Sequence, residues 1–299
     1  MRRLLIIGLL LAASLAAAVA WWLNQPLTLA APTLDLSIEP GTSPRGVAQA
    51  TADAGADVQP TLLYWWFRLS GDARQIRAGS YELVSGVTPV TLLRMLVRGE
   101  ESLRNVTLVE GWNWRQVRQA LARAEMLKPD SQSLDDEAVM RALGRPGLPP
   151  EGRFYPDTYT YAKGSSDLAV LRRALVAMDR RLDAAWAQRA PDTPLKTPEE
   201  ALILASIVEK ETGKPADRAM IAGVFTNRLR AGMMLQTDPT VIYGLGASFD
   251  GNLKKRHLQT DTPWNTYTRA GLPPTPIAMP GSAALVAAVQ PAQTRALYF

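Results

Sequence analysis

The feature that most constrains this chain is an uncharged run of twenty residues, Leu4–Leu23, which begins almost at its N-terminus. As a helix rising about 1.5 Å per residue, such a run spans the hydrocarbon core of a bilayer. Arg2–Arg3 precedes the run, and basic residues favour the cytoplasmic side of a membrane. Trp21–Trp22 closes it, at the level where interfacial aromatic residues concentrate. The sequence therefore predicts a single-pass anchor over residues 1–23, with everything after it outside the cytoplasm.

A cleaved signal peptide is the competing interpretation, because Ala18-Val19-Ala20 resembles a small-residue cleavage site. Twenty apolar residues exceed the usual length of a signal-peptide core, and the tryptophans lie beyond that site. The sequence therefore favours a retained anchor. Either interpretation exports the remainder of the chain.

The composition excludes several kinds of active site. The 299 residues include no cysteine, which excludes disulfides, thiol catalysis and cysteine-ligated metals. The one histidine, His257, argues against a His-rich metal site or a Ser-His-Asp triad, and we expect it to be structural. The net charge of +5 is spread along the chain. It favours mild attraction to anionic lipid or wall polymer and not nucleic-acid binding.

After a proline-containing linker over residues 24–33, the chain repeats one pattern three times. An extended apolar run ends in a glycine, a capping residue follows two positions later, and a helix then begins. The predicted caps are Ser43, Thr88 and Asn113, because Ser, Thr and Asn side chains accept hydrogen bonds from the first N–H groups of a helix. The unequal spacing argues against a solenoid. These strand–helix units predict a small α+β module.

Three further segments stand out by composition. The aromatic cluster Tyr64–Phe67 could stack on sugar rings, but the core side of a short helix is the favoured interpretation. Residues 127–150 are polar and proline-rich, which predicts a connection or a flexible flap. A second compositional block begins at Glu151, and its first expected element is a charged helix over roughly residues 168–189.

The segment after Thr197 combines a complete helix start with an apolar interior. Thr197 is the predicted cap, Pro198 the first helical residue, and Glu200 is placed to reach back toward the cap. Ala201–Val208 is apolar or small all round, and a helix without a polar face is buried on every side. The charged triplet Glu209–Glu211 follows directly.

A carboxyl group at the end of a buried helix is a candidate general acid, because burial disfavours its charged form. Glu209 and Glu211 point roughly 200° apart on the helix, so we expect a single cleft to use one of them. The face below Glu209 carries Ala205 and Ser206, which are small and leave room for a ligand, whereas the face below Glu211 carries larger residues. The sequence favours Glu209, although a solvated helix end is the simpler interpretation of the triplet taken alone.

The surrounding residues carry a resemblance to a known family. The segment Ala205–Thr212 is similar to the signature of the YceG-like (MltG) family of endolytic murein transglycosylases. The similarity extends in order along the chain through Ile76–Tyr81, Gly86, Glu151-Gly152, Phe154, Pro156–Tyr159, Asn227–Leu229, Gly232-Met233, Leu235–Val241, Tyr243-Gly244, Asn265–Tyr267, Gly271–Pro274, Pro276-Ile277 and Pro280-Gly281. By this resemblance the chain is identified as a member of the family.

The resemblance implies a mixed α+β fold with a transmembrane anchor (1–23), a linker (24–33), a small LysM-like module (34–108) and a larger catalytic domain (109–299). It implies an inner-membrane enzyme whose catalytic domain lies in the periplasm. The implied reaction cleaves the bond between N-acetylmuramic acid and N-acetylglucosamine in nascent peptidoglycan strands and leaves a 1,6-anhydro end. The family's catalytic glutamate falls on Glu209, in agreement with the choice made from the helix faces.

In such a reaction one glutamate acts first as acid and then as base, so no second carboxylate, metal or cofactor is expected. The candidate glycan-binding residues among the matched positions are Gln236, Asp238, Asn265, Tyr267 and Glu151. Each also has a structural interpretation, because such residues form turns and caps. The implied partners are peptidoglycan strands, the inner membrane and peptidoglycan synthases, with no nucleic acid.

Two other classes of function remain open in the sequence. Family members usually continue beyond Leu297–Phe299 with a strand and a final helix, so we expect this chain to lack a tail that helps to complete the site. One alternative is therefore a non-catalytic peptidoglycan-binding scaffold of the same fold. The other is a hydrolase with two carboxylates, in which Asp238 or Glu151 assists Glu209.

Overall fold

The computed structural model describes residues 2–299, with side chains from residue 6 onward. Arg2–Arg3, predicted to remain in the cytoplasm, lies outside the described side chains. Helix α1 (Arg2–Leu23) is uninterrupted, since its sequence contains no proline. The segment Ile6–Leu23 has a mean hydropathy of 2.2 and is not buried against the rest of the protein. By length and composition it is suited to cross a membrane, as an anchor or as a signal sequence.

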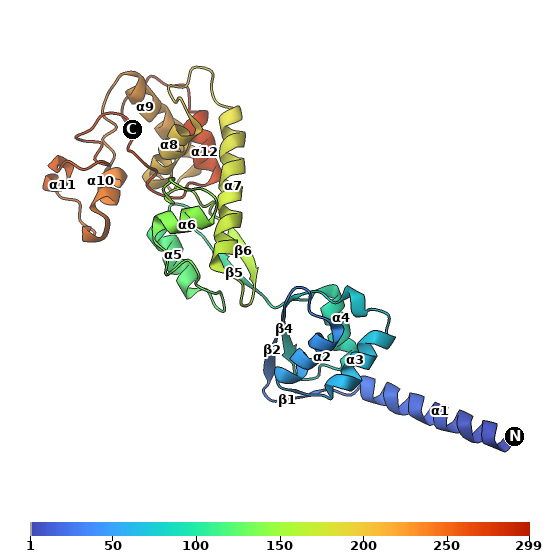
Figure 1. Cartoon of the computed structure of the whole chain (residues 1–299). Helices are drawn as coiled ribbons and strands as arrows, with labels where there is room; N and C mark the ends of the chain where they lie inside the picture. Colours follow the sequence, from blue (N-terminus) through green and yellow to red (C-terminus); the bar gives the residue numbers. More distant parts are fainter. Residues whose placement is uncertain (1) are drawn as a thin grey trace. The chain divides into compact units, whose positions relative to one another are not determined.

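The chain divides into two compact units, and the α-helices and most of the strands are labelled in Figure 1. The N-terminal unit contains the residues up to 104 together with 162–164, and the C-terminal unit contains 105–161 and 165–299. Both mix helices with small sheets, so the coarse α+β prediction is confirmed. The finer domain boundaries stay a prediction.

The N-terminal unit is built on an antiparallel pair of strands, β2 (Thr33–Ile38) and β4 (Gly79–Val84), which are in register along their whole length. Alternate side chains of β2 are buried, as in a sheet that is covered on one face. The connecting and following elements are β1 (Thr28–Leu29), α2 (Pro44–Asp53), β3 (Ala56–Asp57), α3 (Pro60–Leu69), η1 (Ala73–Gln75) and α4 (Pro89–Arg98).

The three helix starts predicted from capping residues are confirmed. Ser43, Thr88 and Asn113 each accept a hydrogen bond from the N–H of the third residue of the helix that follows. The aromatic cluster on α3 divides between two environments. Phe67 is fully buried in the core, whereas the side chain of Trp65 is 50% exposed. The favoured core interpretation therefore holds for only one side of this helix.

The C-terminal unit begins at a third strand pair, formed by β5 (Leu103–Thr107) and β6 (Thr158–Ala162). The boundary between the two units falls within these strands. Residues of these strands share one core with α5 (Trp114–Arg123), α6 (Asp136–Ala142) and α7 (Asp167–Ala187). Residues 127–150, predicted as a connection or flap, in fact include α6. This helix forms because Asp135 caps it and its apolar side chains are buried in the shared core.

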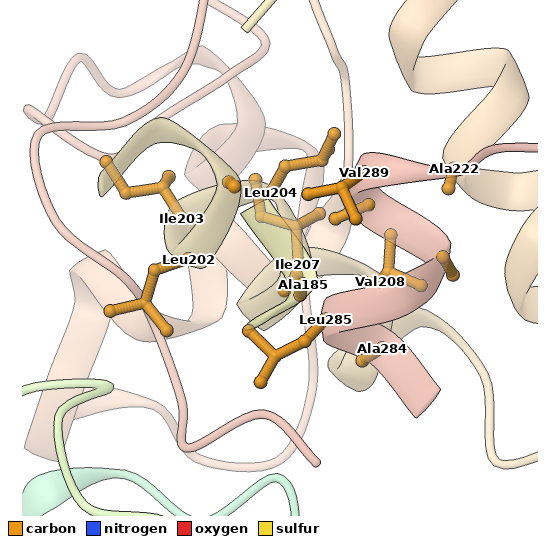
Figure 2. Packing of buried hydrophobic residues seen from close by; sticks show 14 of the residues in the cluster. Ala185, Leu202, Ile203, Leu204, Ile207, Val208, Ala222, Ala284, Leu285 and Val289 are labelled. Atoms are coloured by element: carbon orange, nitrogen blue, oxygen red, sulfur yellow. The ribbon is translucent and has the colours of Figure 1, made fainter. Parts of the chain in front are cut away.

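Helix α8 (Pro198–Glu211) is the centre of the C-terminal unit and is buried from Ala201 to Val208, as predicted. Thr197 caps it, while the Glu200 carboxylate reaches past the cap to the N–H of Lys196. Apolar side chains of α8 meet those of α12 (Ser282–Val289), with α7 and α9 (Arg218–Arg230) alongside (Figure 2). A helix enclosed in this way is fixed in both position and rotation.

The remaining elements of this unit are short. They are η2 (Pro215–Asp217), α10 (Asp238–Leu245), η3 (Gly246–Ser248) and α11 (Lys255–Gln259). His257 accepts a hydrogen bond on Nδ1 from the N–H of Lys254, so it holds the start of α11 together. This contact supports the structural role expected of the histidine.

One buried carboxylate ties α7 to the segment that contains α6. Asp167 is fully buried and accepts hydrogen bonds from the N–H of Ser131 at 2.9 Å and from its hydroxyl at 2.6 Å. Asp167→Ala would leave both donors buried and unpaired. We predict a loss of about 2–3 kcal/mol in the free energy of unfolding, measured by denaturant titration.

Asp179→Ala, on the same helix, is the matched control. Asp179 pairs with Arg145 at 2.8 Å on the surface, and such pairs contribute about 0–1 kcal/mol. Equal losses in the two variants would contradict the role assigned to Asp167.

Candidate active site

Glu209 lies in the last turn of α8 with its side chain only 5% exposed. Its Oε1 accepts a hydrogen bond from Nη2 of Arg218 at 3.1 Å, and its Oε2 accepts one from the N–H of Gly281 at 2.9 Å. Arg218 begins α9 and is itself 10% exposed in its side chain. The buried carboxylate is therefore compensated by a charge from one neighbour and a backbone donor from another.

The segment Ile277–Gly281 covers the face of α8 below Glu209. One turn before Glu209, the hydroxyl of Ser206 accepts the N–H of Ile277 at 3.0 Å and donates to the carbonyl of Ile203 at 2.7 Å. The expectation that small residues on this face leave room for a ligand is therefore wrong. Their small size lets a proline-flanked loop lie close to the helix, and that loop delivers the N–H of Gly281 to Glu209.

A second segment, Glu110–Trp112, lies against the same loop. The N–H of Gly111 donates to the carbonyl of Met279 at 2.9 Å, and the N–H of Met279 donates to the carbonyl of Trp112 at 2.7 Å. Gly111 has φ +76° and lies beside Glu209: a Cβ on it would be 4.0 Å from the Glu209 Cγ. The neighbouring Lys210 donates from Nζ to the carbonyl of Gly111 at 3.2 Å.

Glu110 brings another carboxylate to the same place. The Glu110 carboxylate rests directly on Gly281, the glycine whose N–H binds Glu209, so a side chain at position 281 would have to displace it. Glu110 is exposed, in contrast to Glu209.

A cavity of about 630 Å³ opens beside Gly111 and Lys210. Its wall is mainly aromatic and apolar, with a few polar groups, as in typical ligand sites. It is lined by Gly111, Asn113, Trp114, Arg115, Glu151, Lys210, Pro239, Ile242, Tyr243, Gly246, Phe249, Trp264 and Ile277. Glu209 stands behind the wall formed by Gly111 and Lys210 and does not itself line the cavity.

Glu151 is the buried acid of this cavity, with 6% of its surface exposed. Both carboxylate oxygens lie 3.1 Å from the N–H of Trp114 at the start of α5, and the Tyr243 hydroxyl is a further partner. Burial raises the pKa of Glu151 to about 7, although the hydrogen bonds from Trp114 and Tyr243 oppose the shift. The same burial, with Glu151 nearby, raises the pKa of Tyr243.

Three other candidates lie around the start of α10. The hydroxyl of Tyr267 donates to Oδ1 of the exposed Asp238 at 2.6 Å. Asp238 is the first residue of α10, and Pro239 beside it lines the cavity. Gln236 is exposed and has φ +49°, a left-handed conformation that is held by its N–H bond to Thr266. These side chains are accessible to a ligand.

Asn265, predicted to bind glycan, is instead fully buried. Its Nδ2 lies within hydrogen-bonding distance of three carbonyls, those of His257, Leu258 and Thr260, and its Oδ1 accepts the N–H of Tyr267. The hydrogen bonds of the Asn265 amide are therefore made within the loop. Asn265 positions Tyr267 through its bond to the N–H of that residue.

Glu211 points away from this arrangement, as the helix geometry predicts. Its Oε2 accepts the hydroxyl of Thr237 at 2.8 Å. Burial raises its pKa, with a further contribution from the charge of Asp238. Glu211 therefore tethers the segment before α10, whereas Glu209 faces the 277–281 loop.

Three residues of the site, Arg218, Glu110 and Lys210, are not predicted from the sequence. Lys210 adjoins Glu209 in the chain, but its contact with Gly111 crosses 99 residues. Glu110 precedes a glycine that was noted only as the end of a strand. Arg218 looked like an ordinary charged residue at a helix start. Its burial beside a lone carboxylate is visible only in three dimensions.

The chemistry available here is that of a carboxyl group. Among the described residues, no group of three or more His, Cys, Asp and Glu side chains is arranged to hold a metal ion. The Arg218 guanidinium and the N–H of Gly281 can only donate hydrogen bonds. A proton carried by Glu209 must therefore point away from both of them, toward whatever approaches the carboxyl group.

Comparison with known proteins adds independent information. Residues 36–299 match the model of the YceG-like family. An endolytic murein transglycosylase of Bacillus subtilis (strain 168) is 29% identical over 284 residues, which cover 89% of this chain and 78% of the relative. One from Streptococcus pneumoniae (strain D39) is 26% identical over 296 residues and 88% of this chain. The chain spans about half, 53%, of that streptococcal relative's length.

A solved structure is also similar. The crystal structure of a YceG-like protein from Listeria monocytogenes matches with a TM-score of 0.57 and 26% sequence identity. The match covers 90% of this chain and 93% of the Listeria chain.

The raised pKa of Glu151 makes stability depend on pH in a defined direction. A carboxyl whose pKa is higher in the folded state than in the unfolded state stabilises the fold below about pH 4.5, and this contribution is lost as pH rises through about 7. Glu151→Gln removes the titration. Between pH 5 and pH 8 the wild type should lose up to about 3 kcal/mol of unfolding free energy relative to this variant, measured by urea titration at each pH. A difference that does not change with pH would contradict this assignment.

Proposed function

The chain belongs to the YceG-like family, and from this premise we propose that it is a lytic transglycosylase that cuts peptidoglycan glycan strands internally. Its relatives in Bacillus subtilis and Streptococcus pneumoniae carry the name endolytic murein transglycosylase. The observation that carries the proposal is the setting of Glu209, a buried carboxyl group bound only by hydrogen-bond donors and standing beside an aromatic-lined cavity.

The proposed substrate is a glycan strand bound at this cavity. The aromatic side chains of Trp114, Tyr243, Phe249 and Trp264 suit the apolar faces of sugar rings. Gln236, Asp238 and Tyr267 are accessible beside it, and Glu151 lies inside it as a polar group. We assign these four residues to glycan binding, with Asn265 holding the loop that presents Tyr267.

In the first half-reaction, protonated Glu209 donates its proton to the glycosidic oxygen between N-acetylmuramic acid and N-acetylglucosamine. The C1–O bond breaks, and the N-acetylglucosamine side leaves as an alcohol. Because the Arg218 guanidinium and the N–H of Gly281 can only donate hydrogen bonds, neither group accepts the proton. In the closed arrangement the carboxyl group is 5% exposed, so substrate binding must move the Gly111 or Gly281 segment aside.

In the second half-reaction, the C6 hydroxyl of the muramic acid attacks its own C1 and closes a 1,6-anhydro ring. Glu209, now a carboxylate, takes the hydroxyl proton and returns to its starting state. Arg218 and the N–H of Gly281 stabilise the negative charge between the two halves. No water is consumed, and no second carboxylate is required.

Two neighbouring carboxyl groups invite comparison with an ordinary hydrolase, which uses a pair. Glu151 is bound by Trp114 and Tyr243, and Asp238 is bound by Tyr267. Both have binding partners that suit orientation of the sugar better than activation of water. We therefore assign them to binding and leave Glu209 to act alone.

We further propose that α1 is retained as an anchor in the inner membrane, with the C-terminal unit in the periplasm. The order β2, α2, α3, β4, with an antiparallel strand pair, suits the predicted LysM-like module. Partnership with peptidoglycan synthases remains an expectation from the family resemblance.

The test is digestion of peptidoglycan by the full-length chain, followed by mass spectrometry of the products. Wild type should generate 1,6-anhydro-muramic ends. Glu209→Gln keeps the side-chain volume and the contact with Gly281 but removes the proton, so anhydro ends should fall by about 100-fold or more. Glu211→Gln, two residues away, is the matched control and should retain activity to within about tenfold.

The same assay separates the alternatives. New reducing ends in place of anhydro ends would establish a hydrolase. Glycan that is bound but left intact by the wild type would establish a scaffold and overturn the enzymatic proposal.

A further inference from the structure

Helix α3 exposes a row of large apolar side chains that the proposed reaction does not use. Leu62, Trp65 and Leu69 are 54%, 50% and 79% exposed. At about 100° per residue, these positions fall within roughly 60° of one another around the helix. We call these three residues the α3 ridge.

The other side of α3 is already occupied by the core of the N-terminal unit. Leu63 and Phe67 are fully buried there. The helix therefore has apolar surface on two opposite sides, of which folding covers only one. An exposed apolar row of this size, at helical spacing, is typical of a helix face that contacts lipid or another protein.

The helix that carries the α3 ridge is connected to the end of α1 through the start of α4. Four residues beyond α1, the N–H of Leu27 donates to the carbonyl of Val87 at 2.8 Å, just before α4 begins. Two residues further on, the carbonyl of Pro89 accepts Nε1 of Trp66 from α3 at 3.1 Å. Two hydrogen bonds thus tie α3 to the point where the chain leaves α1.

Charge near the ridge suits a bilayer with anionic headgroups. Arg68 lies in the last turn of α3 and is exposed, and Arg94 is exposed on α4, which packs against α3. Cationic side chains beside an apolar row are the usual composition of a helix that lies in a membrane interface.

We propose that the α3 ridge lies in the outer interfacial layer of the membrane that holds α1. This rests on the retained anchor proposed above. The occupant of the ridge is lipid, with Leu62, Trp65 and Leu69 among the upper acyl chains and the arginines at the headgroups. A helix across the membrane and a second one lying on it would together restrict rotation of the N-terminal unit about the axis of α1.

The experiment uses the full chain, which contains no cysteine and so accepts a single labelled site. Leu62→Cys and Leu69→Cys carry a polarity-sensitive fluorophore on the ridge. Leu103→Cys is the matched control, because Leu103 is an equally exposed leucine (54%) of the same unit. Leu103 also lies away from the exit of α1. Its neighbour Ser102 binds the carbonyl of Ser80 near the start of β4, whereas Val87, which binds Leu27, follows the end of β4.

Each variant is reconstituted in vesicles of phosphatidylethanolamine and phosphatidylglycerol, and flotation of the vesicles reports whether α1 holds the chain. The emission maximum, and its quenching by lipid bearing a nitroxide near the headgroup, report the surroundings of the label. We expect blue-shifted emission and at least about twofold stronger quenching at positions 62 and 69 than at 103.

The outcomes separate the two proposals. Labels at 62 and 69 that match the label at 103, in a chain that floats, would overturn the ridge proposal and leave the anchor intact. A chain that does not co-float with the vesicles would contradict both the anchor proposal and the ridge proposal. Emission at 62 and 69 that shifts only when glycan strands are added would identify a sugar-binding face and also overturn lipid as the occupant.

Discussion

The C-terminal unit depends on one constraint, the charge at the end of the enclosed helix α8. A helix buried on every side from Ala201 to Val208 cannot end in a carboxylate unless the surroundings supply compensation. Arg218 supplies it from the start of α9, and Gly281 supplies it from a loop 72 residues along the chain. Those two contacts bring α9 and the 277–281 loop to the same point, and the 110–112 segment joins through its bonds to Met279. The contacts that hold this unit together are therefore the same contacts that surround the candidate site.

The same contacts explain the division of labour between the two glutamates. Glu211 is bound by Thr237 and holds the segment that leads into α10. Glu209 is bound by the Arg218 guanidinium and by the N–H of Gly281, two donors that can stabilise a negative charge on its carboxylate. Residues two positions apart on one helix thus differ in role because they face different loops.

Burial acts in a different way on Glu151, whose pKa of about 7 results from its place inside the cavity.

Local pattern was sufficient to predict much of this arrangement. The caps at Ser43, Thr88, Asn113 and Thr197, the burial of α8 and the different directions of Glu209 and Glu211 follow from spacing over a few residues. The predictions that were wrong concerned residues whose surroundings are set by contacts distant in sequence. The small face of α8 predicts space for a ligand, but the 277–281 loop fills it. Asn265 has the composition of a binding residue, yet three nearby carbonyls consume its amide. Arg218 and Glu110 carry no local signal that separates them from surface charges.

The most direct test of a single glutamate acting without water is an isotope measurement. Peptidoglycan strands digested by the wild-type chain in ¹⁸O-labelled water would be analysed by mass spectrometry at their newly formed muramic ends. We predict anhydro ends that carry no ¹⁸O, because the attacking oxygen is the sugar's own C6 hydroxyl. Reducing muramic ends that carry ¹⁸O, in place of anhydro ends, would show that water is the nucleophile and would contradict the mechanism assigned to Glu209.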